Sequence, residues 1–341
     1  MRKLKNVLYI TSPDAYISSE GECLKIRTED NPGIRIPAHN LEGVVQFGYP
    51  GASPSAMALC SKLGITISFL TPHGKFLARV EGPQSGNILL RRQQYMLYFR
   101  DESIRLSSRF ITAKVTNCRQ VLLRGYRDYG DKVGTHLCGS ISKLALLAKD
   151  AFSCTDESSL RGIEGDAARE YFKAYNALIL SNREDFYLNG RNKRPPLDNM
   201  NSLLSYLYVF LTHECRSACE SVGLDPSAGF LHKDRPGRPS LALDLMEEFR
   251  PVFVDRLALS MINRKQIVPS DFERLPHGEV RINDDAKRKI IDAWQKRKND
   301  IITHPFLDEK IEFGLLPYAQ ALLLARHIRG DLDDYPAYIW R

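Results

Sequence analysis

The spacing of apolar residues changes once along the chain, and this change constrains the fold more than any other feature of the sequence. The first part contains short apolar segments separated by turn residues, which predict strands: NVLYIT, ECLKIRT, IRIP, GVVQFG and ITISFL. The segment PSAMALCSKLG begins with Pro and Ser and ends with Gly, which predicts one short helix. From residue 88 onward, apolar residues recur at three- and four-residue intervals, the period of amphipathic helices.

We therefore predict an α+β fold, with a small N-terminal β-rich domain (residues 1–87) and a larger all-α domain (residues 88–341), hinged near residues 82–90. The length of 341 residues agrees with two domains, because a single core usually stops growing before about 300 residues. Apolar residues make up 43% of the chain and charged residues 26%, values of a folded globular protein that exclude a disordered chain.

The sequence contains no segment that predicts insertion into a membrane. No apolar run approaches the roughly 20 residues that span a bilayer, and the short apolar run before Ser12-Pro13-Asp14 is unlike a signal peptide. The seven cysteines are scattered and include no CxxC pair, which is typical of reduced thiols rather than of a disulfide framework. We therefore expect a cytoplasmic protein.

The chain is basic, with a formal net charge of +7 and a pI of about 8.9. A phosphate-rich partner is consistent with this charge, because lysine and arginine release condensed counterions on binding nucleic acid, although many basic proteins never contact DNA. One basic segment with an aromatic residue could follow a phosphate backbone and stack on an unpaired base. A solvated loop explains this segment equally well; its residues are Arg183, Tyr187, Arg191, Lys193 and Arg194.

A second cationic segment, NDDAKRKIIDAWQKRKNDII, predicts an amphipathic helix. We expect Asn283 to cap this helix and its cations to face outward. The inward residues would be Ile290, Trp294 and Ile301. The cationic face could bind DNA, but an ordinary solvated helix surface would show the same residues.

Glu164 lies in SSLRGIEGDAAREYF, which predicts a helix from about residue 157. Two glycines, Gly162 and Gly165, flank this glutamate, and a glycine costs about 1 kcal/mol in a helix relative to alanine. Close approach of another group to the backbone would account for them. Two interpretations stay open: another helix packs on the glycines while Glu164 faces water, or Glu164 belongs to a functional site.

Asp244 and Glu247 are three residues apart on a predicted helix that begins with Ser240 as its N-cap, so they share one face about a turn apart. Apolar residues flank both, which indicates a largely buried helix whose carboxylates need a cation or hydrogen-bond donors. The alternative is a solvated acidic stripe that includes Glu248, with Arg250 as an ordinary ion-pair partner.

His232 precedes this helix and is followed by the cations Lys233, Arg235 and Arg238. A histidine and carboxylates among cations suit phosphodiester chemistry, in which a metal ion polarises the phosphoryl group and cations stabilise charge on its oxygens. Imidazole and carboxylate ligands suit Mn²⁺ or Mg²⁺, whereas zinc is less favoured without thiolates. An exposed surface loop could carry the same residues.

Taken in order, these motifs resemble one family, the CRISPR-associated protein one family of adaptation integrases. The resemblance lies in LRGIEGDAAREYF, NKRPPLDNMNSLLSYLY and GLDPSAGFLHKDRPGRPSLALDLMEEFRP. It extends over nearly the whole chain, because LYITSPDAYIS, GASPSAM and PHGKFLARVEGPQSGNILLRRQQY are similar to the family's β-domain. The opening segment is most similar to members of type I-C systems.

The resemblance implies a β-domain used in homodimerisation and a helical domain that carries the catalytic site. It implies that Glu164, His232 and Glu247 are the catalytic residues and the ligands of Mn²⁺ or Mg²⁺, with Asp244 assisting or binding a second ion. The implied partners are prespacer DNA, the CRISPR repeat and a companion, CRISPR-associated protein two, which bridges two dimers.

The implied activity is that of a metal-dependent DNA endonuclease and integrase, which joins 3′-hydroxyl ends of short foreign DNA to repeat phosphodiesters by transesterification. Two other functions stay open. A DNA-binding scaffold without metal chemistry would use the same basic segments. A stand-alone metal nuclease acting on branched repair intermediates would use the same ligands.

Overall fold

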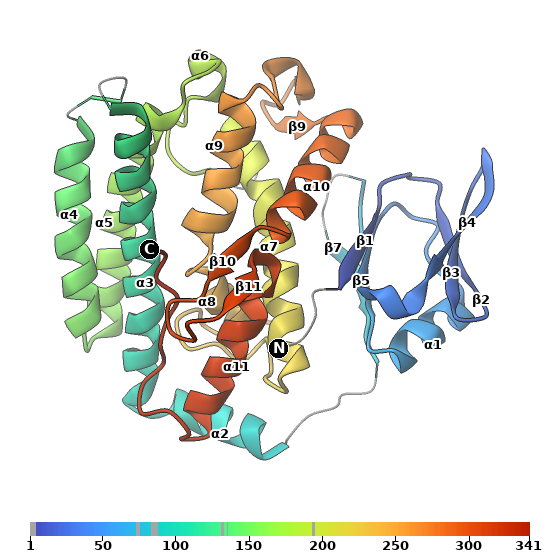
Figure 1. Cartoon of the computed structure of the whole chain (residues 1–341), viewed down its shortest axis with the longest axis horizontal. Helices are drawn as coiled ribbons and strands as arrows, with labels where there is room; N and C mark the ends of the chain where they lie inside the picture. The colour runs from blue at the N-terminus through green and yellow to red at the C-terminus, as the bar shows by residue number, and fades with distance from the viewer. Residues whose placement is uncertain (1–4, 73–75, 83–87, 131–132, 135, 193–194) are drawn as a thin grey trace. The chain divides into compact units, whose positions relative to one another are not determined.

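The computed structural model describes residues 5–72, 76–82, 88–130, 133–134, 136–192 and 195–341 (Figure 1). The chain forms two compact units: unit 1 comprises residues 1–85 and 282–291, and unit 2 comprises residues 86–281 and 292–341. The hinge expected near residues 82–90 includes 83–87, which lie outside the described residues.

Unit 1 contains two sheets. The first has the strand order β1-β5-β6-β7, in which β1, β5 and β6 are parallel and β7 is antiparallel to β6; the second is the antiparallel sheet β2-β3-β4. Their bounds are β1 Asn6–Ile10, β2 Tyr16–Glu20, β3 Cys23–Thr28, β4 Asn31–Pro37, β5 Leu41–Phe47, β6 Thr66–Leu70 and β7 Phe76–Val80. The sequence did not predict β2 and β7, because neither shows a run of apolar residues facing a core.

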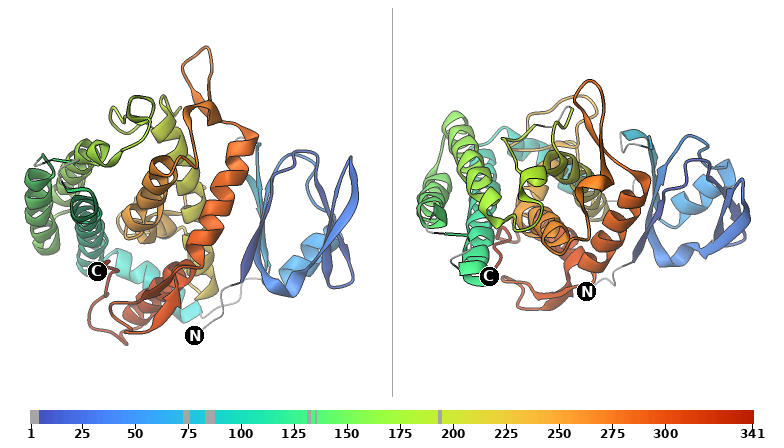
Figure 2. Two further views of the ribbon diagram at one scale, coloured as in Figure 1. Left: turned by 45° about the horizontal axis from the view of Figure 1, so that its top comes forward. Right: turned by 90° about the horizontal axis from the view of Figure 1, so that it is seen from above.

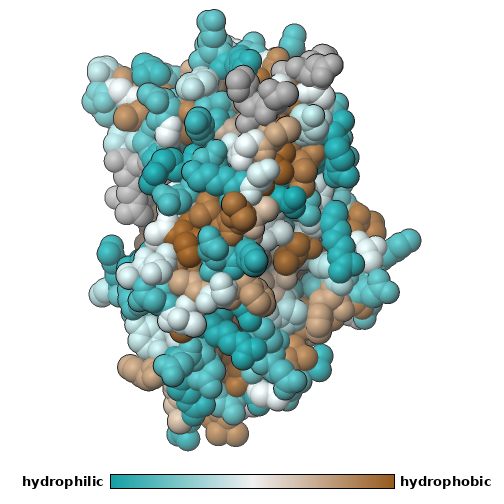
Figure 3. Space-filling view, turned by 90° about the vertical axis from the view of Figure 1, so that its left-hand side faces the viewer, coloured by the Kyte–Doolittle hydropathy of each residue, from teal (hydrophilic) through white to brown (hydrophobic). Residues whose placement is uncertain are grey.

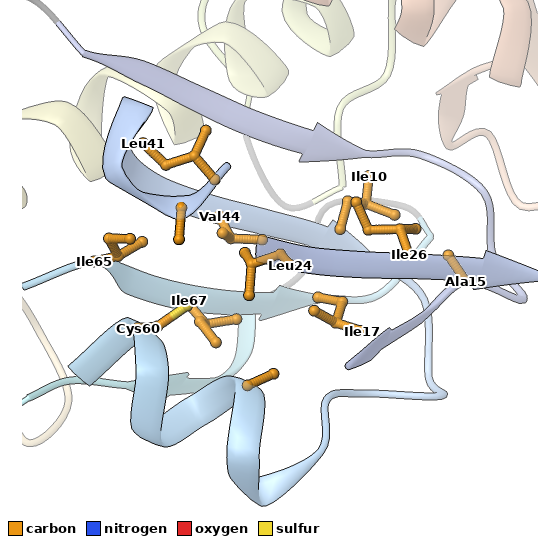
Figure 4. Close-up of a cluster of buried hydrophobic side chains, with 12 residues drawn as sticks. Ile10, Ala15, Ile17, Leu24, Ile26, Leu41, Val44, Cys60, Ile65 and Ile67 are labelled. Atoms are coloured by element: carbon orange, nitrogen blue, oxygen red, sulfur yellow. The ribbon is translucent and has the colours of Figure 1, made fainter. Parts of the chain in front are cut away.

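A short helix, α1 (Pro54–Lys62), packs on this β-structure and closes the core of unit 1 (Figure 4). It begins as predicted: Pro54 occupies the first turn, and Ser53 caps the helix by accepting a hydrogen bond from Ala56 N at 3.1 Å. Cys60 of α1 is buried against aliphatic residues of both sheets, which stabilise the unit by roughly 2 kcal/mol for each large side chain. These include Ile10, Ile17, Leu24, Val44 and Ile67.

Unit 2 is predominantly helical. Helices α3, α4 and α5 lie side by side, and α7 packs against α8 and α11 (Figures 1 and 2). The bounds of the helices are α2 Ile88–Tyr98, α3 Glu102–Tyr129, α4 His136–Ser153, α5 Glu157–Tyr175, α6 Arg183–Phe186, α7 Asn199–Ser221, α8 Ser240–Met246, α9 Arg256–Asn263, α10 Asp284–Lys298 and α11 Leu316–Ile328. A π-helix, Arg250–Asp255, joins α8 to α9.

The all-α prediction for the second domain overlooked two short hairpins. One pairs β8 (Phe272–Arg274) with β9 (Val280–Ile282), and the other pairs β10 (Ile301–Thr303) with β11 (Lys310–Glu312). Three-residue strands are too short to show an alternating pattern in the sequence. The fold class, a β-rich N-terminal part followed by a helix-rich domain, is confirmed.

Helix α10 begins as predicted, because Asn283 Oδ1 accepts a hydrogen bond from Ala286 N at 2.8 Å, and Ile290 and Trp294 are buried. The inward position of Ile301 was a wrong prediction: the helix ends at Lys298, and Ile301 pairs with Glu312 in a hairpin that leaves its side chain 61% exposed.

Two lysines of α10 were expected to face water but do not. Lys287 donates to Pro72 O at 2.7 Å, and the buried Lys298 donates to Glu214 at 2.7 Å. Both side chains therefore serve packing within the chain, which weakens the case for α10 as a cationic DNA-binding face.

The surface of unit 2 around α4 mixes apolar and hydrophilic residues (Figure 3). Leu146 and Phe152 of α4 are 65% and 55% exposed. Scattered exposed apolar side chains are common on folded proteins and do not by themselves indicate a partner. None of the helices within the described residues is long and apolar enough to cross a membrane.

Candidate metal centre

Glu164 lies in the middle of α5, which begins at the predicted position. Asp156 caps this helix by accepting a hydrogen bond from Ser159 N at 2.7 Å. The Glu164 side chain is 37% exposed, and its carboxylate accepts a hydrogen bond from Lys114 of α3. The site therefore includes a cation that the sequence analysis did not single out.

The two glycines beside Glu164 face open space. A Cβ atom built on Gly162 or Gly165 would meet no atom of the described residues within 4 Å, and both glycines are exposed. The interpretation that another helix of this chain packs on them is therefore wrong. They leave the backbone of α5 accessible from outside on the side next to Glu164.

Asp244 of α8 is fully buried and binds the loop that carries His232. Its Oδ2 accepts hydrogen bonds from Phe230 N at 2.6 Å and from Leu231 N at 3.0 Å, and its Oδ1 accepts one from His232 N at 2.9 Å. Four donors, including the imidazole, point at this carboxylate. Burial and these donors make Asp244 the anchor of the loop.

Ser240 was predicted to cap α8, and this prediction is wrong. The helix begins at Ser240 itself, Pro239 occupies the cap position, and no side chain caps the helix. The Ser240 hydroxyl instead donates to Lys233 O at 3.2 Å. The serine therefore also ties the histidine loop to α8.

The imidazole of His232 is oriented by Asp244. Its Nδ1 lies 2.7 Å from Asp244 Oδ1, and its Nε2 lies 3.8 Å from Glu247 Oε1. Because a carboxylate can only accept, Nδ1 donates in this hydrogen bond, and Nε2 is the ring nitrogen directed at Glu247. This carboxylate–histidine arrangement is typical of histidines that ligate metals.

The loop can approach α8 this closely because residue 229 is a glycine. A Cβ atom on Gly229 would lie 2.7 Å from Ser240 Cβ, 2.8 Å from Ser240 C and 2.9 Å from Asp244 Oδ2. We expect Gly229→Ala to push the loop off the helix and to lower the melting temperature. Thermal melting of Gly229→Ala and of Gly139→Ala, a glycine of α4 whose Cβ would meet no atom of the described residues within 4 Å, measures this effect. Equal losses in both variants would contradict the packing argument.

Glu247 lies at the C-terminal end of α8 and is only 2% exposed. Its Oε1 lies 3.0 Å from an Arg250 nitrogen, and its Oε2 lies 2.8 Å from Lys114 Nζ at an angle that makes no hydrogen bond. Burial raises the pKa of this carboxyl, but the charges of Arg250, Lys114 and His232 outweigh burial and lower the pKa to about 2. Glu247 is therefore ionised at neutral pH.

Glu248 is also buried, so the interpretation of these acids as a solvated stripe is wrong. The Glu248 carboxylate accepts hydrogen bonds from Tyr335 Oη at 2.5 Å, from Gln320 Nε2 at 2.9 Å and from the backbone of Tyr338. Burial nevertheless raises the pKa of Glu248 to about 8. Glu248 therefore holds the C-terminal segment in place and points away from the candidate metal ligands.

Lys114 joins the two glutamates. Its side chain is 12% exposed, and its ammonium contacts both Glu164 Oε1 and Glu247 Oε2. Burial opposes the charged form, but the two carboxylates outweigh burial and raise the pKa of Lys114. A helical wheel of α3 could have identified this lysine, because it lies in line with the buried residues Phe110, Cys118 and Val121.

A further buried acid, Asp255, lies at the end of the π-helix next to the site. It accepts a hydrogen bond from Tyr208 Oη at 2.6 Å, and the Tyr208 ring lies 5.1 Å from the guanidinium of Arg250. Burial raises the pKa of Asp255 to about 6, although the hydrogen bond from Tyr208 and the charges of Arg191 and Arg250 lower it. The sequence analysis did not single out Tyr208 or Asp255.

The raised pKa of Asp255 predicts a pH-dependent stability. The folded protein binds this proton more tightly than the unfolded chain, so the stabilisation is complete below about pH 4 and is lost as the pH rises to about 6, by roughly 2 to 3 kcal/mol. The melting temperature of Asp255→Asn should therefore rise relative to that of the wild type as the pH increases from 4.5 to 7. A constant difference between the two proteins over this range would contradict the assignment.

The predicted ligands come from three parts of unit 2, and their side chains do not surround a single point. His232 lies next to Glu247, and Glu164 meets Glu247 through Lys114. In the part of the chain that the structure describes, no group of three His, Cys, Asp or Glu side chains is close enough to hold an ion. The donors nevertheless suit Mn²⁺ or Mg²⁺, and buried Glu247 Oε2 accepts no hydrogen bond.

The basic segment between α5 and α7 is only partly available to DNA. Arg183 is exposed, and Tyr187 is 54% exposed. Arg191 instead lies over the ring of Tyr208 at 5.3 Å and donates a hydrogen bond to Asn201. The remaining two cations of this prediction, Lys193 and Arg194, lie outside the described residues.

Comparison with known proteins identifies the family. The family profile described as CRISPR associated protein Cas1 matches residues 8–296. The chain belongs to the Cas1 family. This Cas1 is 50% identical over 346 residues to CRISPR-associated endonuclease Cas1 2 of Rhodospirillum rubrum and 47% identical over 343 residues to CRISPR-associated endonuclease Cas1 1 of Chlorobaculum tepidum. Each alignment covers 100% of both chains.

Solved structures share the fold of this Cas1 at lower identity. A casposase bound to an integration product has a TM-score of 0.84 at 22% identity, over 98% of this chain and 94% of that chain. A Cas1 protein from Thermotoga maritima has a TM-score of 0.81 at 23% identity, over 98% of this chain and 100% of that chain. A Cas6-RT-Cas1–Cas2 complex matches with a TM-score of 0.83 at 23% identity, over 100% of this chain and 36% of that chain. The resemblance inferred from the sequence is confirmed, and the subtype stays a prediction.

Proposed function

We propose that this Cas1 is a metal-dependent DNA endonuclease and integrase of CRISPR spacer acquisition, with Glu164, His232 and Glu247 as the ligands of the catalytic ion. The geometry of His232 is the main observation in favour. Asp244 binds one nitrogen of the imidazole and three backbone N–H groups of its loop, and the other nitrogen points toward Glu247. One ring nitrogen bound to a carboxylate and the other directed at a second carboxylate is the arrangement typical of metal-binding histidines.

The three ligands would have different tasks at the centre. Glu247 is buried and ionised, so it supplies a fixed negative charge. His232 supplies the Nε2 lone pair, held in orientation by Asp244. Glu164 lies on the exposed side, where Gly162 and Gly165 leave room for a bulky substrate backbone. A bound Mn²⁺ or Mg²⁺ would supply a Lewis acid that polarises a phosphoryl oxygen.

We further propose that the reaction is a transesterification. The 3′-hydroxyl oxygen of the incoming DNA forms a bond to a phosphorus atom of the repeat. The bond from that phosphorus to the departing 3′-oxygen breaks, the hydroxyl proton passes to solvent, and the departing oxygen takes up a proton. Water in place of the attacking hydroxyl would give strand cleavage. The role of the protein is to hold the reacting oxygens and the phosphate in line.

The proposed partners are DNA, a second copy of this chain and CRISPR-associated protein two, in the cytoplasm. Two of the similar folds support this choice: one was solved with an integration product, and another occurs in a complex with Cas2. The net charge of +7 suits a polyanionic substrate.

The proposal is tested by strand transfer of a short 3′-hydroxyl duplex into a supercoiled plasmid that carries a CRISPR repeat, with Mn²⁺ and the purified companion. Glu164→Ala is compared with Glu170→Ala on the same helix, because Glu170 pairs with Ser140 and Lys143 away from the centre. We expect joined product with the wild type and Glu170→Ala but not with Glu164→Ala. DNA binding without joining would favour a scaffold, and cleavage of branched DNA without joining would favour a stand-alone nuclease.

A further inference from the structure

Lys114 has an unusual position for a lysine in a helix. Its ammonium contacts a carboxylate oxygen of Glu164 on α5 and lies 2.8 Å from Oε2 of Glu247 at the end of α8. The side chain is 12% exposed, and its neighbours along the buried stripe of α3, Phe110 and Cys118, are apolar. A buried ammonium is costly without partners, so the two carboxylates are what hold it there.

These two carboxylates are also two of the proposed ligands. A single positive charge of this chain therefore lies between Glu164 and Glu247. Arg250 does not play the same part, because it pairs with the other oxygen of Glu247 at 3.0 Å and its guanidinium lies 5.1 Å from the ring of Tyr208. The Lys114 ammonium thus lies between the two glutamates, whereas Arg250 pairs with the Glu247 oxygen that faces His232.

We propose that Lys114 is a tethered counter-cation of the metal centre, which holds Glu164 and Glu247 together until a divalent ion displaces its ammonium. This inference rests on the proposed function, because it takes these glutamates as metal ligands. It adds to that function a residue that determines which ions bind to the metal centre. An ion that binds Glu164 Oε1 and Glu247 Oε2 has to replace the ammonium that contacts these two oxygens.

The proposal has a consequence for ion selectivity. A tethered ammonium competes at a high effective concentration, because it is attached to the same chain. A monovalent ion brings no more charge than the ammonium and would not displace it, whereas Mn²⁺ or Mg²⁺ brings twice the charge. Lys114 would therefore weaken the binding of all ions and exclude monovalent ions from the centre.

The test is the affinity of the full chain for Mn²⁺ at a fixed neutral pH, measured by titration calorimetry without DNA. Lys114→Met keeps the length of the side chain and removes its charge. We expect this variant to bind Mn²⁺ about tenfold more tightly than the wild type, because an opposing unit charge at contact distance is lost. Lys143→Met, which loses an exposed pair with Glu170 outside the centre, should bind Mn²⁺ like the wild type.

The outcomes separate this inference from the proposed function. Saturable Mn²⁺ binding by the wild type with equal or weaker binding by Lys114→Met would overturn the counter-cation and leave the metal centre standing. Absence of saturable binding in both proteins would overturn the metal centre and the counter-cation together. Lys114→Gln, checked by thermal melting, is the second variant if Lys114→Met does not fold. Tighter binding by either folded variant supports the proposal.

Discussion

Glu247→Gln is expected to lower metal-dependent strand transfer and cleavage by at least about a hundredfold. The substitution keeps the shape of the side chain but removes the buried, ionised carboxylate that meets His232, Lys114 and Arg250. A neutral amide oxygen binds a divalent ion more weakly than a carboxylate does. Strand transfer and Mn²⁺ affinity should therefore fall together in this variant.

A matched control separates loss of the ligand from loss of a buried ion pair. Glu214 is also largely buried, and it pairs with the buried Lys298 at 2.7 Å outside the centre. Glu214→Gln and Glu247→Gln should both lower the melting temperature, since each removes a carboxylate from contact with a buried cation. Only Glu247→Gln should lose Mn²⁺ affinity. Similar losses of activity in both variants would show that Glu247 acts through stability alone.

Asp244→Ala is expected to have the largest effect on stability near the site. It leaves three backbone N–H groups and the His232 ring without their acceptor, each in a buried or half-buried position. Unsatisfied buried donors cost about 1 to 3 kcal/mol each, so even the lower value for these four donors lowers the free energy of unfolding by about 4 kcal/mol. Chemical denaturation measures this change.

Comparison with His232→Ala decides between two roles of Asp244. If Asp244 anchors the loop, Asp244→Ala loses both stability and activity, and His232→Ala loses activity with little change in stability. The family resemblance left open whether Asp244 binds a second ion. In that case Asp244→Ala would keep the stability of the wild type and lose only metal binding, a result that would contradict the anchor.

The sequence predicted the order of the two parts of the chain because strand and helix periods differ clearly on either side of residue 87. It did not predict β2 or the two hairpins of unit 2, which lack alternation or are too short to show it. The helix of residues 284–298 was predicted with its cap but extended too far, because Ile301 continues the helical period into a hairpin.

At the site, the sequence identified the candidate residues but not which groups they contact. The apolar neighbours of Asp244 and Glu247 indicated burial, which the structure confirms. Backbone donors leave no trace in a sequence, so the role of Asp244 as a loop anchor could not be predicted. Lys114 was missed because it is one of several cations of α3 and lies 50 residues before Glu164 in the sequence. The position of Lys114 in an apolar stripe of α3 was nevertheless a usable signal.

The ligand assignment is tested most directly by pulsed electron paramagnetic resonance of Mn²⁺ bound to the full chain. We predict the coupling of one directly bound histidine nitrogen, which disappears in His232→Ala and persists when the exposed His277 is changed to Ala. Mn²⁺ bound without any histidine nitrogen, or a coupling that survives in His232→Ala, would contradict the central claim that His232 and the two glutamates hold the catalytic ion.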